Sequence, residues 1–263
     1  MTLADPRTRP ALPWPTGASL AWHDDVAPRP GPAQMARDVA LAELVRRDGV
    51  PRLRLYTWSP GCLSFGRHEP ALARYDRARL SDEGIAVVRR PTGGRAVWHD
   101  RELTYALALP DAGPAARRRT YHAMHALIAD ALARLGAEPG LAPAGRAPAL
   151  DAGACFAHPV GGEVLLEGRK VVGSAQATLE GVLLQHGSIL LADDQWRVAT
   201  WQRPAAPPRA PEPPRWTALQ VRRALRATLD DLAPVTDAAA GLLDAPAARH
   251  LAHFLDEAWT WRR

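Results

Sequence analysis

Lysine is almost absent from this sequence of 263 residues. Of its 33 basic residues, only Lys170 is a lysine. Arginine can supply surface charge and ion pairs, but it keeps its proton and cannot act as an acid, a base or a compact point charge. The single lysine is therefore a candidate site residue. The alternative is that codon usage removed the other lysines and left this one by chance.

Cysteine and long apolar runs are also scarce. The two cysteines, Cys62 and Cys155, lie far apart, which excludes a disulfide framework and predicts a reducing, cytoplasmic setting. No apolar run approaches the roughly 18 residues of a membrane span, and the N-terminus has no apolar signal-peptide region. We therefore expect a soluble protein that is neither exported nor inserted in a membrane.

The net charge indicates what kind of surface a binding partner would have. A net charge of +5 favours an acidic partner surface. No basic tract is longer than the three arginines at 117–119, and no nucleic-acid motif is present, so the sequence argues against nucleic acid. Hydrophobic content of 47% and charged content of 23% are ordinary for a globular chain of a size that can bury a substantial core.

Proline content divides the chain. Prolines interrupt residues 1–32, which we expect to form an irregular arm with a short strand around Ser19–His23. Residues 33–202 would form the main domain, and residues 203–214, with six prolines in twelve positions, a stiff extended connector. Residues 215–263 would form a helical cap of the same domain.

Hydrophobic periodicity predicts several elements. Helical spacing indicates helices over Ala33–Arg47, ended by Gly49, and over Ala115–Gly136. Alternation of polar and apolar residues predicts a half-buried strand over Arg52–Trp58. Two-residue turns at Glu167-Gly168 and Glu180-Gly181 would fold residues 163–191 into a three-stranded meander.

The meander places the lone lysine. With a period of two, and with Leu179 paired to Val182, one face carries Lys170, Val172, Ser174, Gln176, Gln185, Gly187 and Ile189. Such a polar face predicts a pocket wall. His186 falls on the opposite face with Ala175, so we interpret it as a hydrogen-bonded structural histidine and discount it as a partner of the lysine.

Cys155 is the candidate nucleophile. It lies between small residues and Phe156, so a bulky acyl substrate can approach it. A nearby Lys170 ammonium would favour the reactive thiolate. The alternative is a buried, inert cysteine. Cys62 is the second candidate.

A second candidate constellation is the segment RRPTGGRAVWHD at residues 89–100. Its glycine pair, Gly93-Gly94, lets the backbone approach a ligand closely. Backbone N–H groups there could hold a carbonyl or phosphate oxygen. The alternative is an ordinary hairpin turn.

Three segments in order carry a family resemblance: RRPTGGRAVWHDRELTYALALP, ACF, and EGRKVVGSAQ with GVLLQHGSILL. Over residues 17–200 the chain resembles the biotin/lipoate protein ligase and octanoyltransferase superfamily of cofactor transferases. The resemblance implies an α+β fold with a mixed, largely antiparallel β-sheet flanked by helices.

Within that family, two features favour the transferases. Ligases have a triple glycine where this chain has Gly93-Gly94-Arg95, and Cys155 matches the nucleophile of the Gram-positive-type octanoyltransferases of lipoate synthesis. The segment AHPVGGEV departs from that group, which has an aromatic residue before the glutamate.

The resemblance implies transfer of an octanoyl group from acyl carrier protein to a lysine of the glycine-cleavage H protein or a lipoyl domain. Cys155 would form a thioester acyl-enzyme. Lys170 would favour the thiolate, polarise the carbonyl and help remove the acceptor's proton. No metal or other cofactor is implied, and we expect a monomer. The implied substrate-binding residues are Arg89, Arg90, Thr92, Gly93, Gly94, Arg95, Ala96, His99, Val172, Gly173, Ser174, Ala175 and Gln176.

Three other functions remain open at this point. The chain could be an ATP-dependent lipoate–protein ligase or an amidotransferase between lipoyl domains. A non-catalytic acyl- or carrier-binding protein is the third, but binding alone would need neither Cys155 nor Lys170.

Overall fold

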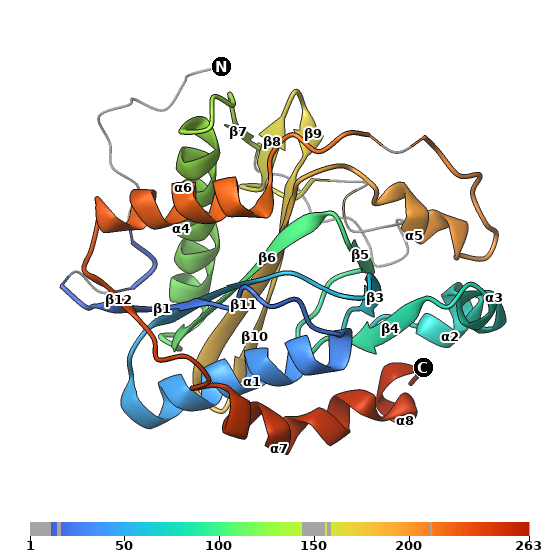
Figure 1. The fold of residues 1–263 in the computed structure, drawn as a ribbon, viewed down its shortest axis with the longest axis horizontal. Helices are drawn as coiled ribbons and strands as arrows, with labels where there is room; N and C mark the ends of the chain where they lie inside the picture. The colour runs from blue at the N-terminus through green and yellow to red at the C-terminus, as the bar shows by residue number, and fades with distance from the viewer. Residues whose placement is uncertain (1–11, 15–16, 144–155, 157–158, 211, 263) are drawn as a thin grey trace.

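A six-stranded mixed sheet forms the centre of the molecule (Figure 1). A computed structural model describes residues 12–14, 17–143, 156, 159–210 and 212–262. In sheet order the strands are β10 (Val172–Leu179), β11 (Val182–Leu190), β6 (Glu102–Pro110), β2 (Arg52–Tyr56), β1 (Leu20–Asp24) and β12 (Val235–Asp237). Strand β1 runs parallel to both of its neighbours, and the other pairs are antiparallel.

Helices cover both faces of this sheet. Helices α4 (Pro114–Ala133) and α6 (Ala218–Asp230) pack on one face, and α1 (Gly31–Asp48) and α7 (Asp244–Leu255) lie on the other (Figure 1). The four short helices are α2 (Ala71–Arg74), α3 (Arg77–Asp82), α5 (Trp196–Thr200) and α8 (Glu257–Thr260). The predicted α+β fold with a mixed, largely antiparallel sheet is confirmed.

Two small sheets flank the central one. The first, in the order β4 (Ala86–Arg89), β3 (Cys62–Phe65) and β5 (Val97–His99), packs with α2, α3 and α5 around a third core. The second contains β7 (Gly140–Leu141), β8 (Val164–Leu166) and β9 (Arg169–Lys170). The first sheet carries the RRPTGGRAVWHD segment, and the second carries the lysine.

Helix α1 forms as its sequence predicts. Prolines stand at its start, and Gly49 ends it in the left-handed conformation with φ 72°, which glycine adopts without strain. The prediction for β2 is wrong in one respect, because all five of its residues are buried and not only alternate ones. The polar face is covered because the Arg54 guanidinium bonds to Asp25 and Asp38 beneath α1.

Both predicted turns of the meander are confirmed. Glu167 and Glu180 have positive φ and are followed by glycines that also do, as in type I′ turns. Leu179 pairs with Val182 as predicted. The meander nevertheless divides at Val171, because β8 and β9 belong to the small second sheet and β10 and β11 to the central one.

The C-terminal segment is built into the same cores. Strand β12 pairs with β1, which lies within the predicted irregular arm. Apolar residues of α6 join the core beneath α4, and those of α7 join the core beneath α1. The division of the chain at the proline-rich connector stays a prediction. No helix in the described part of the chain has the length and apolar character needed to cross a bilayer.

Candidate active site

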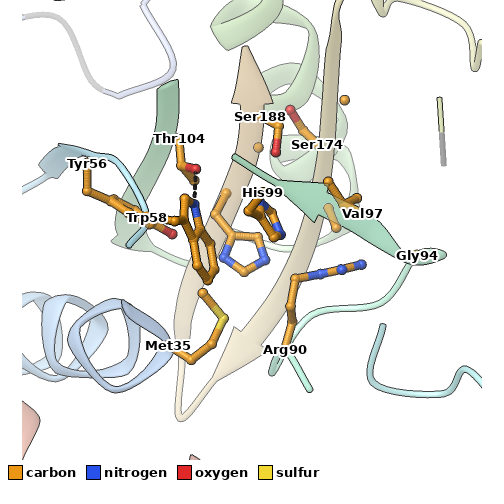
Figure 2. Close-up of a pocket in the computed structure, with 14 residues that line it drawn as sticks. Met35, Tyr56, Trp58, Arg90, Gly94, Val97, His99, Thr104, Ser174 and Ser188 are labelled. Carbon is orange, nitrogen blue, oxygen red and sulfur yellow. Dashed lines mark hydrogen bonds between the residues drawn. The ribbon is translucent and has the colours of Figure 1, made fainter. Parts of the chain in front are cut away.

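A small cleft of about 40 Å³ lies between the first small sheet and the α1 face of the central sheet. Figure 2 shows side chains from both sheets and from α1 converging on it. Its lining comprises Met35, Tyr56, Trp58, Arg90, Gly94, Val97, His99, Thr104, Gly173, Ser174, Ala175, His186, Gly187 and Ser188. Six of the predicted substrate-binding residues are therefore brought together: Arg90, Gly94, His99, Gly173, Ser174 and Ala175.

His99 and Trp58 form one wall of this cleft. Their rings stack with centroids 4.0 Å apart, and the Trp58 indole N–H donates to Thr104 at 2.7 Å (Figure 2). Burial lowers the pKa of His99 despite the neighbouring Glu102 carboxylate, so the ring is neutral near pH 7. Its Nδ1–H then donates to Glu102 at 2.7 Å, and Nε2 accepts from Ser64. The wall is thus a rigid surface of ring faces.

Arg90 shapes the glycine turn. Its guanidinium donates to the Gly93 carbonyl at 3.1 Å and the Arg95 carbonyl at 2.9 Å, and it also contacts Ser64. Gly94 has φ 87°, a conformation that favours glycine. A Cβ on Gly66 would lie 1.8 Å from the Gly94 carbonyl oxygen, so these two backbones meet without side chains. The glycine pair is therefore held at the edge of the cleft.

Arg89 and Ala96 do not line the cleft. The Arg89 guanidinium is fully buried and donates to carbonyls of Gly66, Glu69, Trp259, Thr260 and Arg262, among others. It therefore ties the loop after β3 to α8 and the segment that follows it. Ala96 lies in the core of the first small sheet. The two adjacent arginines of the motif thus point in different directions because side chains alternate along the strand.

His186 lines the cleft, although it lies on the face opposite to the predicted pocket wall. Nε2 lies 2.6 Å from the Thr92 hydroxyl, and Nδ1 lies 2.9 Å from an Asp38 carboxylate oxygen. This histidine holds the turn after Arg90 against the central sheet. The interpretation as a hydrogen-bonded histidine agrees with these contacts, and none of them is with Lys170, so they do not contradict its exclusion as a partner of the lysine.

Lys170 lies on the cleft side of the central sheet. A Cβ built on Gly173, which shares a face with Ala175, would come within 3.2 Å of Lys170 Nζ. The prediction that Lys170 shares a face with Val172, Ser174 and Gln176 is therefore wrong. The alternation is broken at Val171, where the chain passes from one sheet to the other. Gly173, which lines the cleft, thus leaves room for the lysine beside it.

Glu163 was not predicted as a site residue. Its Oε1 lies 2.8 Å from Lys170 Nζ, and both side chains are almost fully buried, at 2% and 1% exposure. Oε1 also accepts from Tyr121 of α4 at 3.0 Å, and Oε2 accepts from the Val160 N–H at 2.7 Å. One signal existed, since Glu163 is the one acidic residue between Cys155 and Glu167.

The other face of β10 serves the scaffold. Gln176 donates to Gln185, Gln185 to Tyr105, and the Tyr105 hydroxyl lies 2.6 Å from Ser174. Ser174 in turn lies 2.7 Å from His125 Nε2. Val172 is part of the core beneath α4. The side chains of Val172 and Gln176 therefore lie away from the cleft. Ser174 is part of the cleft lining, although its hydroxyl bonds to Tyr105 and His125.

His125 completes this chain of hydrogen bonds. Burial lowers its pKa to about 4, so the ring is neutral at pH 7. The Gly162 carbonyl can only accept, so Nδ1–H donates to it at 2.8 Å and Nε2 accepts from Ser174. The chain thus links α4 and β10 to the turn that carries Glu163. No sequence signal marked His125, because it lies within the apolar face of its helix.

Of the two cysteines, only Cys62 lies among the described residues. Cys155 lies outside the described residues, whereas its neighbour Phe156 places its ring centroid 4.9 Å from Lys170 Nζ. Cys62 is fully buried, and burial raises the pKa of its thiol far above the usual value. Because only a thiolate is an effective nucleophile, Cys62 is a poor candidate. Among the described residues, no cluster of His, Cys, Asp and Glu has the arrangement of a metal site.

Known proteins share both the sequence and the fold. Residues 30–207 match the lipoyl protein ligase A/B catalytic domain. Octanoyltransferase LipM of Kyrpidia tusciae is 40% identical over 174 residues, which cover 61% of this chain and 64% of that protein. Octanoyltransferase LipM of Staphylococcus aureus is 37% identical over 166 residues, or 59% of this chain and 60% of that protein. The match thus spans less than two thirds of either relative.

Solved structures extend the likeness to nearly the whole chain. A putative lipoate protein ligase from T. acidophilum with bound lipoic acid has a TM-score of 0.74 at 18% identity, covering 94% of this chain and 100% of that one. Lipoate-protein ligase A bound with ATP gives 0.70 at 18% identity, with 94% and 99% covered. At these identities the likeness concerns the fold alone. From the matched sequence and the shared fold, the chain belongs to the lipoyl protein ligase A/B catalytic domain family.

Proposed function

We propose that this protein is an octanoyltransferase of protein lipoylation. It moves an octanoyl group from acyl carrier protein to a lysine of a lipoyl-accepting protein, the glycine-cleavage H protein or a lipoyl domain. The observation that carries the proposal is the buried Lys170, which lies beside Gly173 of the cleft lining and is ion-paired to Glu163. The names of its relatives, at 35–40% identity, support the same reaction.

The reaction proceeds in two displacements on Cys155. The Cys155 thiolate attacks the thioester carbonyl, the carbon–sulfur bond to the carrier breaks, and the carrier leaves as a thiol after taking a proton. The acceptor amine then attacks the acyl-enzyme, the amide bond forms, and Cys155 is released. The amine gives one proton to solvent in this second step, which balances the proton that the carrier thiol takes up from solvent in the first, so Cys155 returns as the thiolate.

The described residues fit these steps. Met35, Tyr56 and Val97 offer apolar surface for the acyl chain. The Lys170 ammonium polarises the carbonyl where negative charge develops, and the backbone at Gly94 and Gly173 allows the carbonyl to approach closely. None of these roles calls for a metal or a nucleotide.

Intact-mass spectrometry tests the acyl-enzyme. After incubation with octanoyl carrier protein, a quenched sample should gain one octanoyl group that hydroxylamine removes. Cys155→Ser should abolish the adduct, and Cys62→Ser should retain it, because Cys62 is buried. An adduct on Cys62, or full transfer by Cys155→Ser, would contradict the assignment.

The ligase alternative makes the opposite prediction for nucleotide. Arg95 stands where ligases have a third glycine, and its backbone carbonyl is bound by Arg90. We therefore expect no adenylate from free octanoate or lipoate with ATP and magnesium. A lipoate-dependent ATP–pyrophosphate exchange signal would restore the ligase.

A further inference from the structure

We infer that Glu163 is the positioning residue of the catalytic lysine: it holds the Lys170 ammonium beside Gly173, which lines the cleft. The inference rests on the proposed function, since it concerns how the proposed transferase uses Lys170. Glu163 itself lines no part of the cleft. It acts through the lysine that it contacts.

The contact has the geometry of a strong, charge-assisted hydrogen bond. The separation of 2.8 Å between Glu163 Oε1 and Lys170 Nζ occurs at a site that excludes water from both side chains. A lysine side chain has several rotatable bonds, and its ammonium carries no preferred direction of its own. A fixed partner is therefore what decides where Nζ lies.

Glu163 is fixed on every side. Tyr121 donates to the oxygen that bonds Lys170, and the Val160 N–H donates to the other oxygen. On the backbone, the Glu163 carbonyl accepts from Ala142 at 2.8 Å, and its N–H donates to Val160 at 3.0 Å. The carboxylate therefore cannot rotate to follow the lysine, and the lysine must come to it.

The preceding residue anchors the turn. The Gly162 carbonyl accepts from His125, and Gly162 has φ 85°. A Cβ there would lie 2.2 Å from the His122 ring, so the turn is pressed against α4. Through Gly162 and Glu163, the position of Lys170 is therefore fixed relative to helix α4.

The ion pair can be tested without any enzyme activity, because the chain has one lysine. Protein labelled with ¹³C at lysine Cε gives a single lysine signal, which can be recorded at one fixed pH. In Glu163→Gln that signal should move and broaden, because the charged acceptor that holds the ammonium in one position has been removed. An unchanged signal would overturn the ion pair.

The positioning role is tested by a double-mutant cycle on the single-turnover acylation rate. Glu163→Gln alone should slow acylation about 10²-fold, the cost of misplacing a reacting group by about 1 Å. In the Lys170→Ala background the same substitution should cost nothing more, because Glu163 acts only through the lysine. Equal losses in both backgrounds would overturn the inference.

Glu69→Gln is the matched control. Glu69 is also a fully buried glutamate that accepts from a tyrosine hydroxyl, at 2.7 Å, and pairs with a basic residue, Arg74. Its effect on acylation should be the same with and without Lys170. Thermal melts of all variants verify folding, and Glu163→Asp, which keeps the charge, should retain a single narrow lysine signal even where acylation falls.

The two possible failures can be told apart. If the unmodified protein never forms an octanoyl adduct, the proposed function fails, whereas the lysine signal still reports on the ion pair. If the protein acylates normally and the cycle shows no coupling, the function stands and the role of Glu163 is overturned.

Discussion

Gly173 is the residue that gives Lys170 its place. A methyl group there would lie 2.9 Å from Lys170 Cε and 3.1 Å from the Phe156 ring. Its backbone is that of an ordinary strand residue, so an alanine would fold without strain but would push the lysine aside.

Gly173→Ala should therefore reduce octanoyl transfer about 10²-fold with little change in thermal stability. Gly140→Ala is the matched control, because a methyl group at that strand position would meet no atom within 4 Å. Steady-state transfer assays and thermal melts of both variants provide the comparison. Normal turnover by Gly173→Ala would mean that octanoyl transfer does not depend on the position of Lys170 Nζ beside Gly173.

Lys170→Arg separates charge from chemistry at the same site. Arginine keeps its proton across the working range, and its planar guanidinium is larger than the ammonium that contacts Glu163, Phe156 and Gly173. We expect overall transfer to fall about 10²- to 10⁴-fold, the usual contribution of general acid–base help.

Single-turnover measurements would divide this loss between the two half-reactions. Acylation of Cys155 should fall less in Lys170→Arg than in Lys170→Ala, since any nearby cation supports the thiolate. Turnover near that of the unmodified protein would mean that Lys170 supplies only charge.

Strands β4 and β10 each separate two tasks by side-chain direction. Along β10, Gly173 and Ala175 face the cleft, whereas Ser174 and Gln176 bind the scaffold. At the end of β4, Arg89 binds the C-terminal segment, and Arg90, the next residue, binds the glycine turn. The paired arginines, which are adjacent in the sequence motif, therefore stabilise two different parts of the fold.

Arg89→Met tests this separation. It would leave several buried carbonyls without a donor, so we expect the free energy of unfolding to fall by about 3 kcal/mol or more. Activity per folded molecule should stay near normal, because Arg89 does not line the cleft. Arg90→Met should instead lower the acylation rate of folded protein. Denaturant titrations with parallel activity assays would decide, and a rate loss in folded Arg89→Met would contradict the assignment.

Local rules predicted much of these elements, and contacts distant in sequence decided the rest. The turn at Glu180-Gly181 and the register from Leu179 to Val182 follow from one dipeptide. The face of Lys170 does not, because the change of sheet at Val171 depends on what β8 and β10 pair with. Likewise, His186 lines the cleft because strands β3–β5 cover its face, which no pattern within β11 reveals.

At the scale of the whole molecule, buried histidines govern the response to acid. Burial lowers the pKa of both His23 and His125 from 6.5 to about 4. The unfolded chain takes up a proton near pH 6.5, whereas the native protein does so only near pH 4. Each histidine therefore stabilises fully above pH 6.5, and this contribution is lost as pH falls to 4, by at most about 1.4 kcal/mol per pH unit.

Asp194 acts in the opposite direction. Burial, with Glu102 and Asp100 nearby, raises its pKa from 3.8 to about 7, so the native protein keeps a proton that the unfolded chain releases. Its contribution is lost as pH rises from about 4 to 7. Two histidines outweigh one aspartate, so the free energy of unfolding should rise between pH 4 and 6.5. Asp194→Asn should steepen that rise, and His125→Gln should flatten it, as urea titrations across this range would show.

The pairing of Lys170 with Glu163 also bears on whether Lys170 itself can be acylated. Under the proposed function, a site that delivers acyl groups to lysine amines carries one such amine itself, beside the proposed thioester. An amine attacks through its nitrogen, and the Lys170 nitrogen is held toward the Glu163 carboxylate at 2.8 Å. Under the same proposal, this pairing keeps Lys170 from becoming an acyl acceptor. With arginine at every other basic position, no second lysine is exposed to stray acylation.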